Sequence, residues 1–474
     1  MSDGPETSDA AAPQLTAAVL RAFREALLRM PVPKNDGQAL ELIEEMERTK
    51  AALAATQAAT TTVVARRRRT TLQDARDQAR AAGKRGFGHI EASIGAEIGL
   101  ARRESPTQGR THLELADALT HDLPHTLTAL FEGDINEERA LIIARETADL
   151  TAEDRSTLDA ELFGTGHYDD TIALGDHQLR DLLRRIAYRL DADGTTTRWA
   201  KARARRRVTT RNLGDGTARL SAIIAIEHAA TVATALDTAA ETARNAGDPR
   251  TRDQVKADTL VARITGTDSP AAPDPDRDAA PVLVNLLISA ETLLGDSTEP
   301  GHVPGIGPIP AAFAHHWVAR ATTQARAALR RLFTAPTDRD LVAMESGSRT
   351  FPPALAELIG LRDTGTCRTP WCNAPIRHHD HAPSADQGGT TSFDNGQGLC
   401  EACNYIKETP DWITWVTTTP TGRQEIGTVT PSGHTYATRP PPQPGNPRPH
   451  TLRGEFYLPE HLTLVVSDDY DLAA

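Results

Sequence analysis

The sequence predicts an α+β fold, with a mostly helical N-terminal domain followed by a small C-terminal module stapled by four cysteines. Alanine is abundant beside arginine and glutamate, residue types that lose little side-chain freedom in a helix. Short β-prone stretches interrupt the helical ones, and every cysteine lies in one short segment. Aromatic residues make up only 4% of the chain, so Leu, Ile, Val and Ala are expected to fill most of the core.

The length of the chain, 474 residues, is enough for two or three domains that each bury a core. A segment rich in Pro, Asp and Ala between Gly266 and Pro281 is typical of a linker. We therefore expect four parts: a mainly helical domain over 14–265 with a short β-hairpin near 207–225, an α/β continuation and connector over 281–362, the cysteine module over 363–410, and C-terminal strands with a proline-rich tail over 411–474.

The first helical stretch extends from about residue 14 to 103. Leu42, Met46 and Leu53 recur at helical spacing, which indicates an antiparallel helical pair or a coiled coil and allows a homo-oligomer through these helices. Four consecutive arginines, 66–69, cannot share one helix face, so most of them are expected in solvent.

Later elements follow from capping and turn signals. Asn136 is a helix cap, and Thr151 with Asp154 fits a capping box. Asp215-Gly216 suits a hairpin turn. The sequence further predicts helices over about 227–246, 250–264 and 353–362, and strands over 281–288, 412–418 and 425–428.

Charge and hydropathy bear on the partners and the cellular compartment of the protein. The formal net charge of −12 does not indicate a nucleic-acid binder, although binding depends on local patches. Residues 1–13 lack the pattern of an export signal, and no apolar stretch approaches the roughly 18–20 residues that span a bilayer. We expect a cytoplasmic protein with no membrane partner.

The cysteines form two close pairs, Cys367 with Cys372 and Cys400 with Cys403, separated by 27 residues. Paired cysteines in a chain without an export signal point to metal, and two such pairs can converge on one tetrahedral Zn²⁺. Four thiolates close the coordination shell, so this zinc would be structural and would supply on the order of 10 kcal/mol of local folding energy. The alternative is four unligated thiols.

The residues between and after the pairs carry a second pattern. His378-His379-Asp380-His381 is followed by Gly388-Gly389, then Asn395, and then the run from Leu399 to Lys407. This order closely resembles the HNH nuclease motif. The resemblance implies a ββα-metal module, a β-hairpin followed by a short helix that together grip a catalytic metal.

The resemblance also implies a role for each residue. His381 would be the general base, since an imidazole exchanges protons at neutral pH. Asp380 and Asn404 would ligate a divalent cation, Mg²⁺ or Mn²⁺, which stabilises the charge that develops on the phosphate. Asn395 would hold the hairpin loop in place.

Two departures from the motif bear on activity. Asn404 stands where many members have His, and Gly396 follows Asn395 where Leu is commoner. An amide oxygen is a weaker ligand than imidazole for transition metals but suits Mg²⁺. His379 and Lys407 are candidate DNA contacts beside the site.

Upstream segments resemble an actinobacterial family, the thirteen-E-twelve repeat family, in which a long helical domain of unknown function precedes an HNH module. The resemblance covers about residues 15 to 440. The segments occur in this order: Asp117-Ala-Leu119 with Leu123-Pro124, Glu132-Gly-Asp-Ile135, Arg207-Val208, Asp215-Gly216, Arg250-Thr-Arg-Asp-Gln254 with Ala257-Asp258, and Gly305-Ile-Gly-Pro-Ile-Pro310.

Three functions are compatible with these patterns. The favoured one is a metal-dependent endonuclease acting on DNA, and the alternative is a non-catalytic zinc-containing protein that binds nucleic acid. A third makes the helical region an oligomerisation scaffold. From Leu361 to Pro410 there are four Lys/Arg and six Asp/Glu, so the module itself is not basic. We therefore expect the basic stretch Arg198–Arg211, with Arg203, Arg205 and Arg206, to attract the phosphates.

Overall fold

The computed structural model describes residues 16–83, 88–164, 168–213, 217–266, 286–289, 292–293, 297–304, 306–323, 345–346, 350–419, 423–441 and 443. The chain divides into two compact units, Met1–Glu47 with Pro447–Ala474 and Arg48–Asn446. The architecture is a mostly helical α+β fold, as the sequence predicts. No helix within these described ranges is long and apolar enough to cross a membrane.

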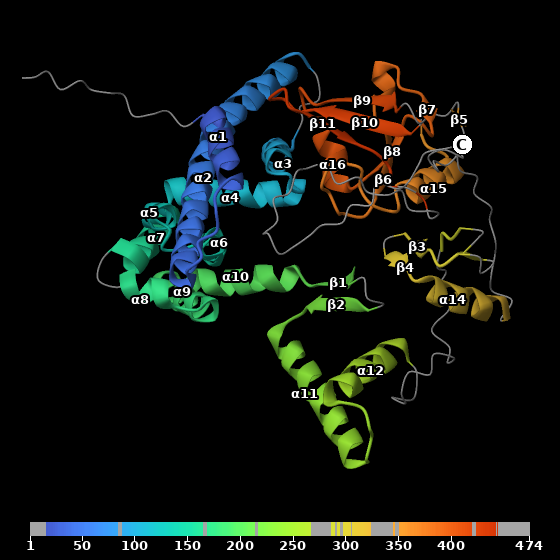
Figure 1. The fold of residues 1–474 in the computed structure, drawn as a ribbon, viewed down its shortest axis with the longest axis horizontal. Helices are drawn as coiled ribbons and strands as arrows, with labels where there is room; N and C mark the ends of the chain where they lie inside the picture. Colours follow the sequence, from blue (N-terminus) through green and yellow to red (C-terminus); the bar gives the residue numbers. More distant parts are fainter. Residues whose placement is uncertain are drawn as a thin grey trace, which may run out of the picture. The chain divides into compact units, whose positions relative to one another are not determined.

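The first unit contains helix α1 (Ala17–Leu28) and the beginning of α2 (Asp36–Ala81). Thr16 caps α1, because its side chain accepts a hydrogen bond from the Val19 backbone N–H. The apolar side chains of α1 are exposed, Val19 at 52% and Phe23 at 43%. Helix α2 continues without a break into the second unit (Figure 1).

The buried stripe of α2 differs from the one that the sequence suggests. Met46 is exposed, and Leu42 and Leu53 are only half-buried. Small side chains at helical spacing are buried instead: Ala51, Ala54, Ala55, Ala58, Thr62 and Ala65, with Leu72 beyond them. Small residues let neighbouring helices approach closely, so α2 packs through alanine rather than leucine.

The arginine run on α2 is also less solvated than expected. Arg66 and Arg67 are exposed, but Arg68 approaches Glu97 at 3.4 Å. Arg69 binds Asp117 and Glu91, which strongly raises its pKa through hydrogen bonds to the two carboxylates. Half of the run therefore fixes α2 to its neighbouring helices.

The helices that follow α2 pack on it. They are α3 (Ile90–Arg102), α4 (Pro106–His121), α5 (Pro124–Glu132), α6 (Glu137–Glu146), α7 (Ala152–Asp159), the π-helical turn η1 (Ala160–Gly164), α8 (Tyr168–Ala173) and α9 (Asp176–Leu190). Helix α3 packs in a smaller cluster with Leu72 of α2, and the helices from α4 onward share the main hydrophobic core. Leu119, Leu130, Ile143 and Leu179 are fully buried in this core. The predicted caps Asn136 and Thr151 are confirmed at the starts of α6 and α7.

Helices α3 and α4 cross at backbone contact. A Cβ atom on Gly109 would overlap the carbonyl oxygen of Gly95 and the backbone of Gly99. Glycine is therefore required at this crossing, because any side chain would push the two helices apart.

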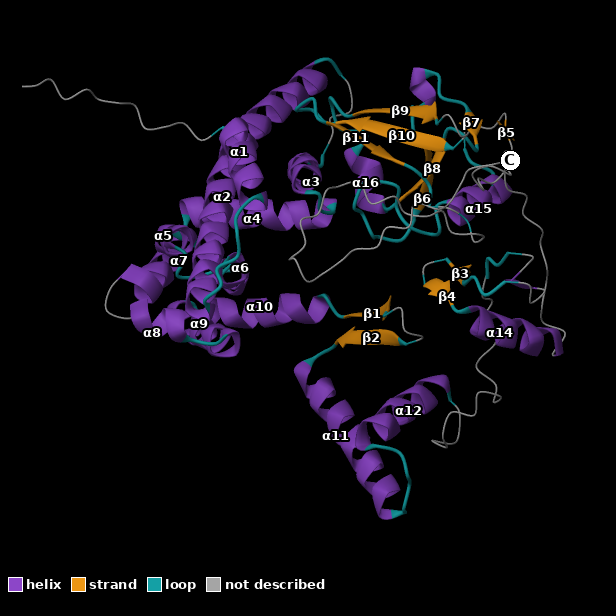
Figure 2. Ribbon diagram, in the orientation of Figure 1, coloured by secondary structure: helices purple, strands orange, loops and turns teal. Residues whose placement is uncertain are grey.

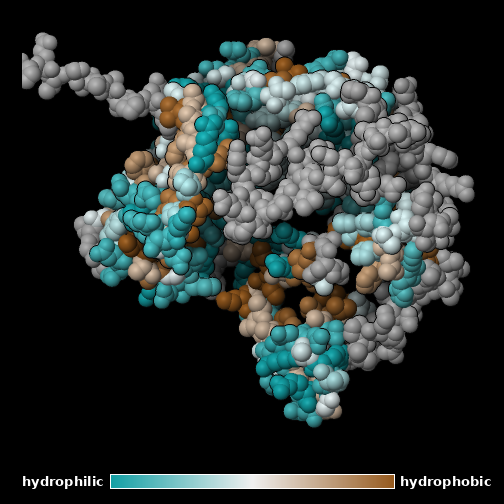
Figure 3. Space-filling model, in the orientation of Figure 1, coloured by the Kyte–Doolittle hydropathy of each residue, from teal (hydrophilic) through white to brown (hydrophobic). Residues whose placement is uncertain are grey.

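The next segment is an exposed hairpin followed by a helical pair. It consists of α10 (Ala192–Ala204), β1 (Arg207–Asn212), β2 (Ala218–Ile223), α11 (Ile226–Asn245) and α12 (Arg252–Thr265). The predicted hairpin and helices are confirmed, with the turn residues 214–216 outside the described residues. Apolar side chains gather over the hairpin and the beginning of α11 (Figure 3), and include Val208 at 63% and Ile226 at 68% exposed.

A small α/β segment follows. It contains β3 (Gly301–Val303), β4 (Gly307–Ile309), α14 (Ala311–Thr323) and β5 (Glu345–Ser346). Of the strand predicted over 281–288, the first five residues lie outside the described residues. Leu287 forms an antiparallel bridge with His302.

The C-terminal part carries most of the strands (Figure 2). Its elements are α15 (Pro353–Arg362), β6 (His378–His381), the 3₁₀ turn η2 (Ala385–Gln387), β7 (Thr391–Ser392), β8 (Gly396–Leu399), α16 (Glu401–Ile406), β9 (Ile413–Thr418), β10 (Gln424–Val429) and β11 (Thr435–Thr438). The predicted helix over 353–362 and the two predicted strands are confirmed. A third strand, β11, completes an antiparallel sheet of order β11-β10-β9.

Candidate functional site

A β-hairpin followed by a helix forms the centre of the cysteine module. Strands β6 and β8 pair antiparallel, with His378 opposite Leu399 and His381 opposite Gly396. Cys400 then caps α16, because its sulfur accepts a hydrogen bond from the Cys403 backbone N–H. One short connection therefore carries the chain from the second strand into the helix.

The four cysteines converge at one end of this hairpin. All are buried, and their sulfur atoms lie within 4.8 Å of one another. The Sγ of Cys372 lies 3.9 Å from that of Cys400 and 3.8 Å from that of Cys403. These distances are too long for disulfides but match sulfurs that surround a tetrahedral ion, about 3.8 Å apart for metal–sulfur bonds of ~2.3 Å. The cluster could therefore hold a metal such as zinc.

The charge on the cluster supports the same conclusion. Hydrogen bonds among the thiols, with Cys367 contributing most, raise the pKa of Cys372 and Cys403, while hydrogen bonds within the cluster lower the pKa of Cys367 and Cys400. Several thiolates this close repel one another, so full deprotonation requires a positive charge among them. A divalent cation supplies that charge.

Asp380 and His381 are neighbours on β6, and their side chains lie close together. His381 is buried, contacts the Phe351 ring at 4.7 Å between ring centroids, and shares a 2.8 Å hydrogen bond between Nε2 and Thr391 Oγ1. Its Nδ1 lies 3.6 Å from Asp380 Oδ1. Because Thr391 occupies Nε2, Nδ1 is the nitrogen left to act on another molecule.

Asp380 faces the helix that follows the hairpin. Its Oδ2 lies 2.9 Å from Lys407 Nζ, at the end of α16. Burial acts to raise the pKa of Asp380, but the Lys407 ammonium and the His381 backbone N–H outweigh it and hold that pKa below its usual value. Asp380 is thus a carboxylate that faces the positive charge of the Lys407 ammonium.

Asn395 holds the loop that joins the two strands. Its side-chain amide donates to the carbonyl oxygens of Thr390, at 2.8 Å, and Pro383, at 3.2 Å. Its backbone oxygen accepts a hydrogen bond from the Ala382 N–H, next to His381. These bonds fix the backbone that follows His381.

Asn404 lies on the first turns of α16, three residues before Lys407. Residues three apart on a helix share a face, so Asn404 lies on the same face of the helix as Lys407. The Asn404 Oδ1 atom is buried and has no hydrogen-bond partner in the part of the chain that the structure describes. A buried acceptor without a partner is costly, and a bound cation would satisfy it.

A cavity of about 350 Å³ opens beside β6 and the end of α16, and neither Asn395 nor Asn404 is among the described residues that line it. Asp380, His381, Lys407 and Phe351 line it, together with residues of the loop after β6. His379 lines it as well, and burial lowers the pKa of His379. His379 therefore lies at the cavity, where it stays a candidate DNA contact.

The sequence-predicted arginines do not line this cavity. Arg203 lies at the end of α10, where it makes an ion pair with Glu227, and Arg205 and Arg206 are exposed before β1. The structure therefore brings Asp380, His381, Asn395 and Lys407 together. The arginines belong to a different surface.

Sequence reasoning missed a buried ion pair beneath the hairpin. Arg362 binds Asp363 at 2.8 Å and donates to the carbonyl oxygens of Phe393 and Gly396. Asp363 in turn accepts from the Gly398 N–H. The pair joins the end of α15 to β8, yet an Arg-Asp dipeptide at a helix end is usually a solvated charge, so the sequence offered no signal.

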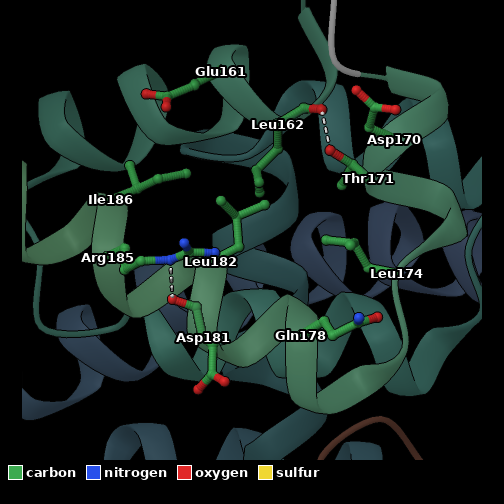
Figure 4. Close-up of a pocket in the computed structure, with 10 residues that line it drawn as sticks. All are labelled: Glu161, Leu162, Asp170, Thr171, Leu174, Gln178, Asp181, Leu182, Arg185 and Ile186. Atoms are coloured by element: carbon green, nitrogen blue, oxygen red, sulfur yellow. Dashed lines mark hydrogen bonds between the residues drawn. The ribbon is translucent and has the colours of Figure 1, made fainter.

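Two other cavities lack a comparable set of groups. One of about 480 Å³ lies between η1, α8 and α9, where Leu162, Leu174 and Leu182 form an apolar interior (Figure 4). Its acidic side chains lie apart on the rim in that view. The other, about 810 Å³, is an open groove beside Arg69 and His89.

Among the described residues, the four cysteines are the group of three or more His, Cys, Asp and Glu side chains whose geometry could hold an ion. Asp380 belongs to no such group, so a second metal there would depend on the Asn404 amide and on water or substrate. No curated protein and no solved structure matches the chain. A family model described as domain of unknown function DUF222 matches residues 43–363 and ends just before the cysteine module. The chain belongs to this DUF222 family.

Proposed function

We propose that the protein is an HNH-type endonuclease that hydrolyses phosphodiester bonds in DNA with a divalent metal, and that zinc staples its four-cysteine cluster. The observation that carries this proposal is the cavity of about 350 Å³ at the β6–β8–α16 unit, where a buried histidine and a carboxylate lie side by side. The family match ends at residue 363, so it does not bear on the module's chemistry.

His381 is the general base in this proposal. Thr391 fixes the orientation of the ring through Nε2, and Nδ1 is left to take a proton from the attacking water. Asn395 is a positioning residue, because its bonds to Thr390 and Pro383 hold the loop beside His381.

Asp380 and Asn404 are the residues that would hold the catalytic cation, Mg²⁺ or Mn²⁺. Carboxylate and amide oxygens suit such hard cations, and the unpartnered Asn404 Oδ1 gives one of them a reason to bind. When bound, the cation supplies positive charge opposite the negative charge that develops on the phosphate. Lys407 lies at the same cavity, where its ammonium can contact a phosphate oxygen.

A plasmid-cleavage assay with Mg²⁺ or Mn²⁺ tests the proposal. His381→Ala should lower the cleavage rate about 10²- to 10⁴-fold, the usual contribution of a general base. Its zinc content and circular dichroism should remain those of the wild type, and added imidazole should restore part of the rate.

The matched control is His177→Ala, which removes an exposed histidine on α9 and should cut at the wild-type rate. Equal cleavage by His381→Ala would remove His381 from the role of base. A wild type that binds DNA but never cuts it with either metal would support the alternative, a non-catalytic zinc-containing nucleic-acid-binding protein.

A further inference from the structure

The β1–β2 hairpin divides its side chains between two chemically different faces. Directly opposite residues of an antiparallel pair share a face, and alternate residues along a strand do too. The register pairs Arg207 with Ile223, Thr209 with Ser221, and Arg211 with Arg219. One face therefore presents Arg207, Thr209, Arg211, Arg219 and Ser221, which we call the arginine face, and the exposed Ile223 lies at its edge opposite Arg207.

The arginine face is open. All five of its side chains are exposed, and within the described part of the chain none of its three arginines makes an ion pair. The opposite face carries the exposed apolar side chains Val208 and Leu220, so it cannot bind phosphates as the arginine face can.

The charge of this region is opposite to that of the rest of the chain. Between Arg198 and Ile226 there are eight Lys/Arg and one Asp, in a protein whose formal net charge is −12. Arg211 and Arg219 are directly opposite each other across the hairpin, and like charges in that position are unfavourable. A bound polyanion would relieve this repulsion.

We propose that the arginine face of the β1–β2 hairpin binds double-stranded DNA by entering its major groove. The major groove of B-form DNA, about 12 Å wide, admits a two-stranded ribbon. Arginine contacts guanine edges and phosphates there, and serine and threonine bond to several bases. This inference rests on the proposed function in that it takes DNA to be the substrate.

The same face fits other nucleic acids poorly. The deep, narrow major groove of A-form RNA excludes side chains, so a ribbon cannot read duplex RNA. Single strands are held mainly by stacking on aromatic rings, and the arginine face has no aromatic side chain.

The test measures binding of the full-length protein to a labelled 24-base-pair DNA duplex by fluorescence anisotropy, with no divalent cation and no chelator added. Salt is varied, and RNA duplex and single-stranded DNA of the same sequence are compared. The variant is Arg207→Gln/Arg211→Gln/Arg219→Gln. Its control, Arg145→Gln/Arg244→Gln/Arg263→Gln, removes three exposed arginines from helices and the same charge.

The hairpin variant should bind duplex DNA at least about tenfold more weakly at physiological salt. The slope of log affinity against log salt should become shallower by roughly 1 to 3, since each phosphate contact contributes about 0.9. The control variant should lose less affinity for duplex DNA than the hairpin variant, and its salt slope should change less. An Arg→Lys triple variant, which keeps the charge, should retain the slope but lose discrimination between sequences.

Equal losses in the hairpin variant and its control would overturn the proposal, as would duplex RNA binding as tightly as duplex DNA. Unchanged duplex binding by the hairpin variant would overturn it too, and would leave an acidic protein as the partner to examine. The binding measurement does not depend on catalysis, so the two proposals can fail separately. If the wild type binds DNA through the hairpin but never cuts it, only the proposed nuclease activity is contradicted. If the wild type cuts DNA and the hairpin variant binds it normally, only the proposed DNA binding by the arginine face is contradicted.

Discussion

The helical region around α2 and the cysteine module are held together by different forces. The helical region buries a continuous set of Leu, Ile and Ala side chains, so apolar burial alone can stabilise it. The module buries its four cysteines with Leu399 and packs Phe393 against the apolar side chains of α15, and its other buried groups include Asp363 and Asn395. We expect the module to depend on its polar bonds and on a metal bound by its cysteines, and such bonds can hold reactive side chains in fixed positions.

The largest effect should come from breaking the cysteine cluster. Cys403→Ser should release the metal and with it on the order of 10 kcal/mol of local stability, since zinc binding and folding are coupled in small sites. Hydrogen exchange should become fast in β6, β8 and α16 and stay slow in α5 and α6. Asn373→Ser, an exposed change in the loop after Cys372, is the control and should leave exchange unaltered. Slow exchange in the module of Cys403→Ser would contradict a metal-dependent fold.

The helical region should be most sensitive where its backbones touch. Gly109→Ala adds a methyl group against Gly95 and Gly99, and overpacking of this kind costs about 3 kcal/mol. The urea midpoint should fall accordingly. Gly88→Ala, whose Cβ would meet nothing within 4 Å, should hardly change it. A Gly109→Ala protein of wild-type stability would show that α3 and α4 are not packed as closely as described.

A smaller effect concerns the buried carboxylate of Asp159. It accepts hydrogen bonds from the backbone N–H groups of His125 and Thr126 and caps the beginning of α5. Burial raises its pKa despite these bonds, so the folded state holds the proton more tightly than the unfolded one. The wild type should therefore lose stability as pH rises from about 4 through the raised pKa.

Asp159→Asn stays neutral and should flatten that part of the stability profile, at a cost of about 1 kcal/mol for an altered cap. Urea midpoints at a series of pH values measure both the slope of stability against pH and the cost of the altered cap. The exposed change Asp176→Asn, at the start of α9, is the control and should keep the wild-type slope. An identical slope for Asp159→Asn and the wild type would contradict a raised pKa.

Local patterns predicted the elements that depend on neighbouring residues. The cysteine spacing indicated the cluster, the β-prone stretches gave the hairpin, and the helix over 353–362 matches α15. Asn136 and Thr151 cap the helices that they were expected to cap.

What the sequence could not predict depends on distant partners. The leucine stripe near Leu42 suggested the packing face of α2, but the buried alanines have exposed neighbours such as Ala59, and only tertiary contacts decide which alanines are buried. Arg69 binds Asp117, 48 residues away, and Arg362 reaches the Gly396 carbonyl 34 residues on. No local pattern encodes such pairs, and the arginine face became visible only once the strand register was known.

The most direct measurement is the zinc content of the purified protein by elemental analysis, in material prepared without chelator. The contrast between a region held by packing and a module held by metal predicts about one zinc per chain, retained in His381→Ala and lost in Cys403→Ser. Much less than one zinc per wild-type chain, with β6, β8 and α16 still protected from exchange, would contradict it.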